Sequence, residues 1–145
     1  EDDDNSAISE AIGAADIAHL GNRRVPSLSG GERARAAFAR VIAGRTGVLL
    51  LDEPTAALDL KHQEAVLSLA RSRAAEGDAV IVVLHDLNLA GAYADRIALL
   101  RQGSIAALGS PAEVLTASIV SAVYDSPVEV IPHPVTGRGI VLPLR

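Results

Sequence analysis

The sequence contains no cysteine, no methionine and no tryptophan. Without cysteine it has no disulfide framework, no cysteine-based zinc site and no thiol nucleophile. Without methionine it lacks the residue at which translation normally starts, so we expect it to be part of a longer protein. Only Phe38, Tyr93 and Tyr124 are aromatic. So few stacking side chains, with no basic stripe, argue against nucleic acid as a partner.

Long hydrophobic runs are also missing. No uninterrupted apolar stretch approaches the ~20 residues that a membrane-spanning helix needs. The chain does not open with a basic segment followed by an apolar one, as a secretory signal would. Nearly half of its 145 residues, 49%, are apolar, which is enough to form the core of one compact domain. We therefore expect a soluble chain in a cytoplasmic setting.

Most of the net charge of −5 comes from the acidic run at residues 1–4, which supplies −4 and leaves −1 for residues 5–145. We interpret the run as a solvated loop before a helix, because acidic side chains are favourable near a helix N-terminus. The charge therefore says little about binding partners.

Two helices are predicted in the first third of the chain. Apolar residues recur at helical spacing over 6–20, and the pattern stops at Gly21. The second helix is predicted to begin after Ser29 and to end at Gly44. Its expected apolar stripe consists of Ala34, Ala37, Phe38, Val41 and Ile42.

Two uninterrupted apolar runs, Val48–Leu51 and Ala79–Leu84, predict strands that are buried on both faces, as in a parallel sheet. The residues between them, 62–76, read as an amphipathic helix, so the three elements form a βαβ crossover. Polar residues follow both strands, namely 52–53 and 85–86. Ligands bind at this carboxyl edge of the sheet in open α/β folds.

The last third has a different pattern. Ile97–Leu100 and Ser104–Leu108 predict a hairpin with Gly103 in its turn. Two β-like stretches follow at 128–131 and 140–142. The fold class expected from the sequence is α/β, with a partial parallel sheet, flanking helices and a small C-terminal antiparallel β extension.

The segment Leu28–Glu32, with the sequence LSGGE, directly precedes the second helix. Ser29 is a good N-cap, and Gly30 and Gly31 leave backbone N–H groups uncovered. A helix N-terminus with open N–H groups attracts anions, which predicts a phosphate site. The alternative is an ordinary serine-capped helix after a glycine turn.

Asp52 and Glu53 are adjacent carboxylates at the end of the first strand. Alternation along the strand would turn them in different directions, so one could serve a magnesium ion while the other faces an attacking water. The alternative is a strand end exposed to solvent. His85 follows the second strand, and although a lone histidine there is more often structural, its expected place on the same edge favours a catalytic role.

Together these residues resemble the ABC ATPase family, whose fold is of the P-loop NTPase type. Leu28–Glu32 resembles the family's signature, and Val48–Glu53 resembles its Walker B strand. Pro54–Asp59 resembles the D-loop, with Ala56 where serine is frequent, and His85 matches the switch histidine. Below, Leu28–Glu32 is called the signature segment and Pro54–Asp59 the D-loop segment.

The resemblance implies a role for each residue in a dimer. Ser29, Gly30, Gly31 and Glu32 would bind ATP held by the opposite subunit, with Ser29 and Gly31 at its γ-phosphate. Asp59 would link the two ATP sites across the dimer.

The same resemblance implies the catalytic groups. Asp52 would hold Mg²⁺, mainly through water, and Glu53 would orient or deprotonate the attacking water. His85 would contact the γ-phosphate. Such a set suits phosphoryl transfer, which needs mainly positioning and charge neutralisation.

The sequence also departs from the family pattern, because G-x-x-x-x-G-K-[S/T] does not occur in it. The family's Q-loop glutamine would precede residue 1. We therefore expect the C-terminal part of one nucleotide-binding domain: 1–45 as the end of a helical subdomain, 46–110 as a RecA-like core and 111–145 as a C-terminal extension. We expect this chain alone neither to bind ATP tightly nor to hydrolyse it.

Residues 85–96 resemble importers of iron chelates, heme and cobalamin, and the ending at 128–138 is most similar to hemin-import ATP-binding subunits. The resemblance implies an ATPase that powers hemin uptake, with ferric-siderophore or cobalamin import as alternatives. It implies ATP and Mg²⁺ as cofactors, and a homodimer, permease subunits and, indirectly, a substrate-binding protein as partners. Its place would be the cytoplasmic face of a bacterial membrane. His19, His62 and His133 are expected at the surface, too scattered for a ligand cluster.

Two other classes of function stay open. One is an ABC ATPase of DNA repair or of the ribosome, although such proteins usually carry long coiled-coil inserts or tandem domains. The other is a non-catalytic interaction module with the same fold, against which the intact Glu53 and His85 argue.

Overall fold

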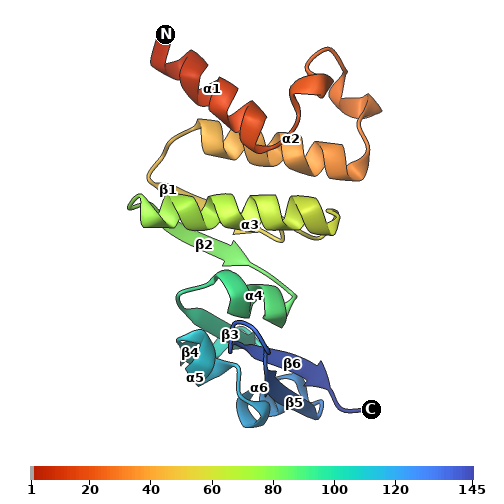
Figure 1. Cartoon of the computed structure of the whole chain (residues 1–145), viewed down its shortest axis with the longest axis vertical. Helices are drawn as coiled ribbons and strands as arrows, with labels where there is room; N and C mark the ends of the chain where they lie inside the picture. Colours follow the sequence, from red (N-terminus) through yellow and green to blue (C-terminus); the bar gives the residue numbers. More distant parts are fainter. Residues whose placement is uncertain (1) are drawn as a thin grey trace. The chain divides into compact units, whose positions relative to one another are not determined.

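The computed structural model describes the backbone of residues 2–145 and the side chains of residues 5–145 (Figure 1). The side chains of the acidic run at 1–4 therefore lie outside the described residues. The chain forms two compact units that divide between Leu84 and His85. The three-part division expected from the sequence stays a prediction.

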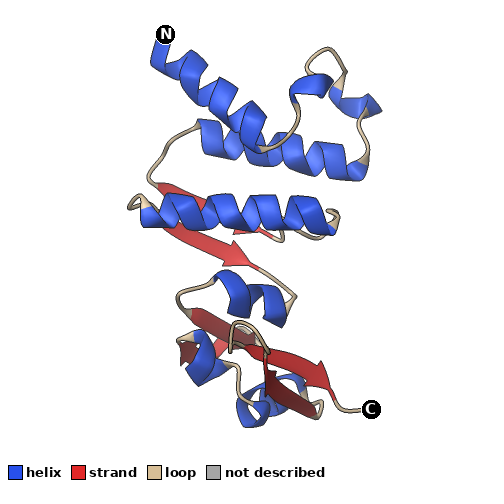
Figure 2. Ribbon diagram, in the orientation of Figure 1, coloured by secondary structure: helices blue, strands red, loops and turns tan. Residues whose placement is uncertain are grey.

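The first unit contains four helical segments, followed by two strands with one long helix between them (Figure 2). In chain order they are α1 (Asp2–Ala14), the 3₁₀ helices η1 (Ala18–Leu20) and η2 (Val25–Ser27), α2 (Gly30–Ala43), β1 (Val48–Asp52), α3 (Leu60–Ala75) and β2 (Ala79–Val83). The first helix includes Asp2 and ends at Ala14, whereas the sequence predicted a helix over 6–20. It ends early because Asp16 has a left-handed φ of 51°, which turns the chain.

Strands β1 and β2 pair in parallel, in a register from Val48 opposite Ala79 to Asp52 opposite Val83. Helix α3 connects them, and Asp59 caps its first turn. The predicted βαβ crossover is therefore confirmed.

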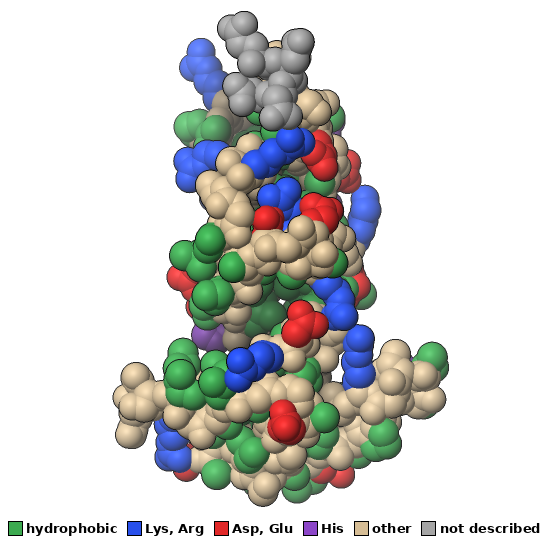
Figure 3. Space-filling model, turned by 90° about the vertical axis from the view of Figure 1, so that its left-hand side faces the viewer, with side chains coloured by type: hydrophobic (Ala, Val, Ile, Leu, Met, Phe, Trp, Pro, Cys, Tyr) green, Lys and Arg blue, Asp and Glu red, His purple; other side chains and the backbone are tan. Residues whose placement is uncertain are grey.

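The sheet is buried on one face only. Leu49 and Leu51 belong to the core, whereas Leu50 and Ile81 are 65% and 62% exposed. The prediction that both faces are buried is wrong for the described residues, because α1, α2 and α3 all pack into the same core and none of the described segments covers the other face. Apolar side chains are visible among charged ones on the molecular surface (Figure 3).

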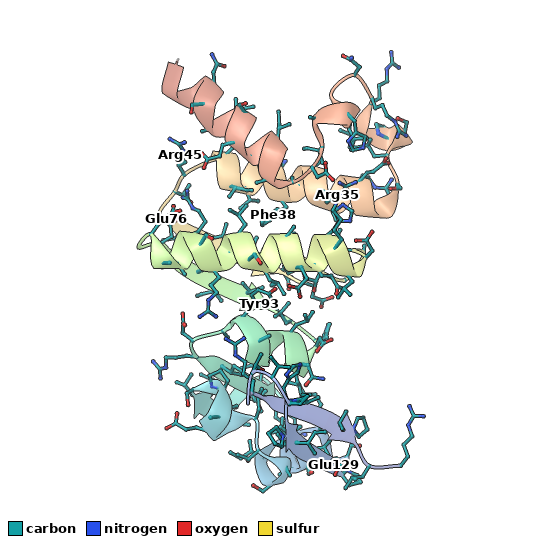
Figure 4. All side chains as sticks on the ribbon, in the orientation of Figure 1. Arg35, Phe38, Arg45, Glu76, Tyr93 and Glu129 are labelled. Atoms are coloured by element: carbon teal, nitrogen blue, oxygen red, sulfur yellow. The ribbon has the colours of Figure 1, made fainter. Side chains whose placement is uncertain are left out.

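Helix α2 turns a slightly different face to the core than the sequence predicted. Phe38, Ala39 and Ile42 are buried, whereas Ala37 and Val41 are exposed. The buried face is shifted because α1 and α3 supply core residues as well as the sheet. Phe38 lies between α2 and α3 (Figure 4). An apolar stripe that is rich in alanine does not predict which of two neighbouring helix faces is buried.

The second unit contains three short helices and two antiparallel strand pairs. Its elements are α4 (Leu87–Tyr93), β3 (Ile97–Arg101), β4 (Ser104–Gly109), α5 (Pro111–Val114), α6 (Ala117–Tyr124), β5 (Val128–Pro132) and β6 (Gly139–Pro143). Strands β3 and β4 form the predicted hairpin, and its turn residues Gln102 and Gly103 have φ values of 50° and 76°. Two positive φ angles define the tight turn that matches strand twist. The β5–β6 pair confirms the C-terminal antiparallel extension.

Asn88 fastens α4 to the C-terminal strand pair. Its Oδ1 accepts a hydrogen bond from the Val141 backbone N–H over 2.8 Å, and its Nδ2 donates to the Val141 carbonyl over 3.3 Å. The Val141 side chain is buried in the core of the second unit. One amide therefore satisfies both backbone groups of a core residue.

We expect Asn88→Ala to lower the free energy of unfolding by about 1–3 kcal/mol, because it leaves the two Val141 backbone groups without partners. Urea unfolding of the chain measures the loss. The matched control is Asn22→Ala, at an exposed turn, which should change stability by less than about 0.5 kcal/mol. Equal losses of stability in the two variants would show that the Asn88 bonds to Val141 do not stabilise the fold.

Candidate nucleotide-binding site

Ser29 begins α2 with a complete capping box. Its Oγ accepts a hydrogen bond from Glu32 N over 3.2 Å, and its own N–H donates to Glu32 Oε2 over 2.7 Å. The predicted N-cap is therefore confirmed. A hydroxyl that accepts one bond still has its proton to donate. Ser29 can therefore cap the helix and donate to an anion at the same time.

The Glu32 side chain stabilises the conformation of the signature segment. Besides the bond from Ser29, its Oε1 forms an ion pair with Arg23 Nη1 at 3.1 Å. The backbone N–H of Ser29 holds the pKa of the Glu32 carboxyl below its ordinary value. The carboxylate thus stays charged and bound within the chain.

The two glycines of the signature segment have different surroundings. A Cβ on Gly30 would meet no atom within 4 Å, so its backbone is open to approach. A Cβ on Gly31 would lie 3.2 Å from the carbonyl oxygen of Ala57. Gly31 therefore lets the first turn of α2 pack against the D-loop segment. The structure brings together two motifs that lie more than twenty residues apart in the sequence.

We expect alanine substitutions at Gly30 and Gly31 to have different effects on stability. Gly30→Ala should leave stability unchanged or raise it, because alanine restricts the unfolded chain and meets nothing in the fold. Gly31→Ala should be less stable than Gly30→Ala by about 1 kcal/mol, the scale of overpacking a close contact. Urea unfolding of both variants of this chain gives the difference. A Gly31→Ala variant as stable as Gly30→Ala would show that the close approach to Ala57 is not required.

Asp52 and Glu53 lie at the carboxyl end of β1. Asp52 pairs with Val83 in the sheet, and the Glu53 N–H donates to the Val83 carbonyl over 3.1 Å. Both residues are exposed. Glu53 has a φ of 47°, so the chain leaves the strand at this residue. That the two side chains point in different directions stays a prediction.

A left-handed φ at a residue with a side chain costs roughly 1–2 kcal/mol. We therefore expect Glu53→Gly to leave the free energy of unfolding unchanged or to raise it by up to about 1 kcal/mol. The control is Ala65→Gly on the exposed face of α3, which should lower stability by about 1 kcal/mol. Urea unfolding compares the stability of the two variants. A loss of stability in Glu53→Gly as large as that in Ala65→Gly would show that the Glu53 backbone is not strained.

The D-loop segment is held by two residues in the first turn of α3. Gln63 Nε2 donates to the carbonyls of Thr55 and Leu58, over 3.2 Å in each case. Asp59 Oδ1 accepts from the His62 backbone N–H over 3.0 Å and lies 2.6 Å from the His62 ring Nδ1. The pKa of Asp59 is lowered chiefly by the backbone N–H of His62 and next by its ring.

His62 and Gln63 were not predicted from the sequence as functional candidates. His62 was expected at the surface, and its side chain is partly buried, with 19% exposed. His19 is exposed as expected, while His133 is partly buried and accepts hydrogen bonds from Val135 N and Thr136 N. The signal that could have found His62 is an Asp N-cap three residues before a histidine.

His85 belongs to the second unit, two residues beyond the end of β2, and its side chain is exposed. The next residue, Asp86, caps α4 by accepting from the N–H groups of Asn88 and Leu89. That His85 acts together with Glu53 stays a prediction.

Among the side chains that the structure describes there is no cluster of three or more histidine, aspartate or glutamate residues that could hold a metal ion. Mg²⁺ needs fewer protein ligands, commonly one or two carboxylates with water and substrate phosphates. The exposed Asp52 fits that donor set. No helix in residues 2–145 has both the length and the apolar character of a membrane span.

Three features together indicate a class of protein. They are the signature segment, the D-loop segment and strand β1 with the adjacent carboxylates at its end. Residues 1–56 match the model of the family described as ABC transporter. The chain is similar to the ATP-binding domains of ABC transporters.

Among curated proteins, the chain is similar to those named hemin import ATP-binding protein HmuV. It is 60% identical to the one from Streptomyces coelicolor over 144 residues, which is 99% of this chain and 51% of that protein. It is 61% identical to the one from Rhodococcus jostii, over 99% of this chain and 49% of that protein. The chain thus spans about half the length of these relatives.

Solved structures agree in fold. A metal-chelate type ABC transporter in an inward-facing conformation matches with a TM-score of 0.81 and 30% identity, over 97% of this chain and 57% of that one. A dimeric bacterial ABC transporter cassette matches with a TM-score of 0.67 and 31% identity, over 73% of this chain and 46% of that one. The α/β fold of the ABC ATPase type, predicted from the sequence, is therefore confirmed.

Proposed function

We propose that this chain forms part of the ATP-hydrolysing subunit of an ABC importer, and that the imported substrate is hemin. The ATPase part of the proposal is supported by the signature, Walker B and D-loop residues and by the family match. The hemin part is supported by the names of relatives that are about 60% identical over nearly the whole chain. Ferric siderophores and cobalamin are the alternatives among substrates.

The observation that carries the ATPase proposal is the contact of Gly31 with the carbonyl of Ala57. It fixes the open N-terminus of α2 beside the D-loop segment. A helix tip with free N–H groups favours phosphate, and the Ser29 hydroxyl has its proton to give. In a homodimer, this surface would bind the γ-phosphate of ATP held by a second copy.

Hydrolysis needs a water molecule to attack the γ-phosphorus as the bond to ADP breaks. The Glu53 carboxylate would accept or orient the proton of that water, and His85 would donate to a γ-phosphate oxygen. Mg²⁺, held near Asp52 through water, would neutralise charge on the phosphates. Asp59 would meet the second copy and couple the two sites.

The partners follow from the proposed function. A second copy of the ATP-binding subunit would complete each ATP site, and relatives solved as dimers support this arrangement. Permease subunits would carry hemin across the membrane, with a substrate-binding protein delivering it. The ATP-binding subunit would therefore lie at the cytoplasmic face of the membrane.

The activity is testable in a chimera that joins the preceding half of the Streptomyces coelicolor relative to this chain. We expect the chimera to hydrolyse ATP and Glu53→Gln to lower kcat by about 10²–10⁴-fold, the usual contribution of a general base. Glu129→Gln, at an exposed position of β5, is the control and should keep full activity. An unchanged kcat in Glu53→Gln would contradict the assigned role.

Uptake assays in cells whose own importers are deleted separate the substrates. The chimera, produced with the permease and binding protein of the same relative, should restore uptake of labelled hemin. Uptake of ferric siderophore or cobalamin instead would exclude hemin. Failure of the chimera to co-purify with any permease, despite ATPase activity, would favour a non-transport ABC ATPase.

A further inference from the structure

His62 holds one oxygen of the Asp59 carboxylate from two directions. The backbone N–H of His62 is 3.0 Å from Asp59 Oδ1, and the ring Nδ1 is 2.6 Å from the same atom. A carboxylate can only accept hydrogen bonds, so Nδ1 carries the proton in this contact. With Gln63 bound to the Thr55 and Leu58 carbonyls, the start of α3 fixes both the backbone of the D-loop segment and its terminal carboxylate.

The second carboxylate oxygen is left for another partner. Asp59 Oδ2 makes no hydrogen bond to any residue that the structure describes, and the Asp59 side chain is 68% exposed. A carboxylate with one oxygen fixed presents the other in a defined direction. Such an acceptor loses less conformational entropy on meeting a partner than a freely rotating side chain would.

The opposite edge of the His62 ring faces Asp16, in the turn after α1. Nε2 is buried, has no hydrogen-bond partner among the described residues and lies 4.0 Å from Asp16 Oδ2. Asp16 Oδ2 also binds Lys61 Nζ at 3.2 Å, and the Asp16 carbonyl accepts from Arg35 Nη1 over 2.7 Å. Because Arg35 belongs to α2, its bond to the Asp16 carbonyl holds this turn, which lies beside the His62 ring, to the helix that begins at the signature segment.

We propose that His62 is a positioning residue for the D-loop. It orients the Asp59 carboxylate through Nδ1–H, and its ring lies beside the Asp16 turn that Arg35 holds to α2. His62 itself does not touch the nucleotide and acts through Asp59. The consequence for turnover rests on the function proposed above, since Asp59 meets a second copy only in an ATPase dimer.

The contact is tested in this chain by carboxyl NMR titration of Asp59 in wild type, His62→Ala, His62→Gln and His62→Asn. Asparagine places an amide donor close to the position of Nδ1, whereas glutamine places it nearer to Nε2. We expect the pKa of Asp59 to rise toward its ordinary value in the alanine and glutamine variants and to return toward the wild-type value in the asparagine variant. The rise should be partial, because the backbone N–H of residue 62 remains.

The ¹⁵N spectrum of the wild-type ring provides a second readout. The 2.6 Å contact with Asp59 Oδ1 requires a proton on Nδ1. An Asp59 pKa that is the same in all four proteins, or a ring protonated only at Nε2, would overturn the proposal. Amide spectra of each variant show whether it is folded, and the asparagine variant keeps the test valid if alanine unfolds the chain.

Turnover is tested in the chimera. His62→Ala should lower kcat on the order of 10- to 100-fold, the effect of a small misplacement of a functional group, with KM for ATP nearly unchanged and activity restored by asparagine. Equal kcat values in all variants would overturn the positioning role. A parent chimera without any ATPase would refute the proposed function, while the Asp59 titration would still decide the contact.

Discussion

The packing of the first turn of α2 against the Ala57 carbonyl is the constraint on which the site depends. It favours glycine at position 31, because a Cβ there would lie 3.2 Å from that oxygen. The contact places the open helix tip beside the D-loop segment, and Gln63 and Asp59 then tie that segment to α3. Two motifs distant in sequence therefore lie side by side, held by hydrogen bonds and close packing against backbone groups rather than by exposed ion pairs, which contribute little.

The carboxyl end of strand β1 differs from this surface, because its backbone conformation is strained. Glu53 adopts a left-handed φ of 47° although it has a side chain, and its N–H is fixed by the Val83 carbonyl. Strain of this kind persists only where surrounding structure determines the backbone, and it is concentrated at functional sites. The parallel pairing of β1 with β2 provides that support. Both adjacent carboxylates at this turn, Asp52 and Glu53, are exposed.

Much of this architecture could be predicted from local patterns. The cap at Ser29, the βαβ unit and the hairpin at Gly103 each follow from a few neighbouring residues with a strong preference. The buried face of α2 and the exposed face of the sheet could not be predicted, since they depend on which elements pack together. His62 was missed for the same reason, because its neighbour Asp16 lies forty-six residues earlier in the chain.

We propose that the signature segment and the D-loop segment act as one surface that closes over the nucleotide of a second copy. Hydrogen exchange of the chimera carrying Glu53→Gln, measured with and without ATP, shows whether the two segments respond together. We expect the amides of residues 29–32 and 57–59 to become protected together when ATP is added, and only at protein concentrations that permit dimers. ATP binding without joint protection of these two segments would show that they do not form one nucleotide-binding surface.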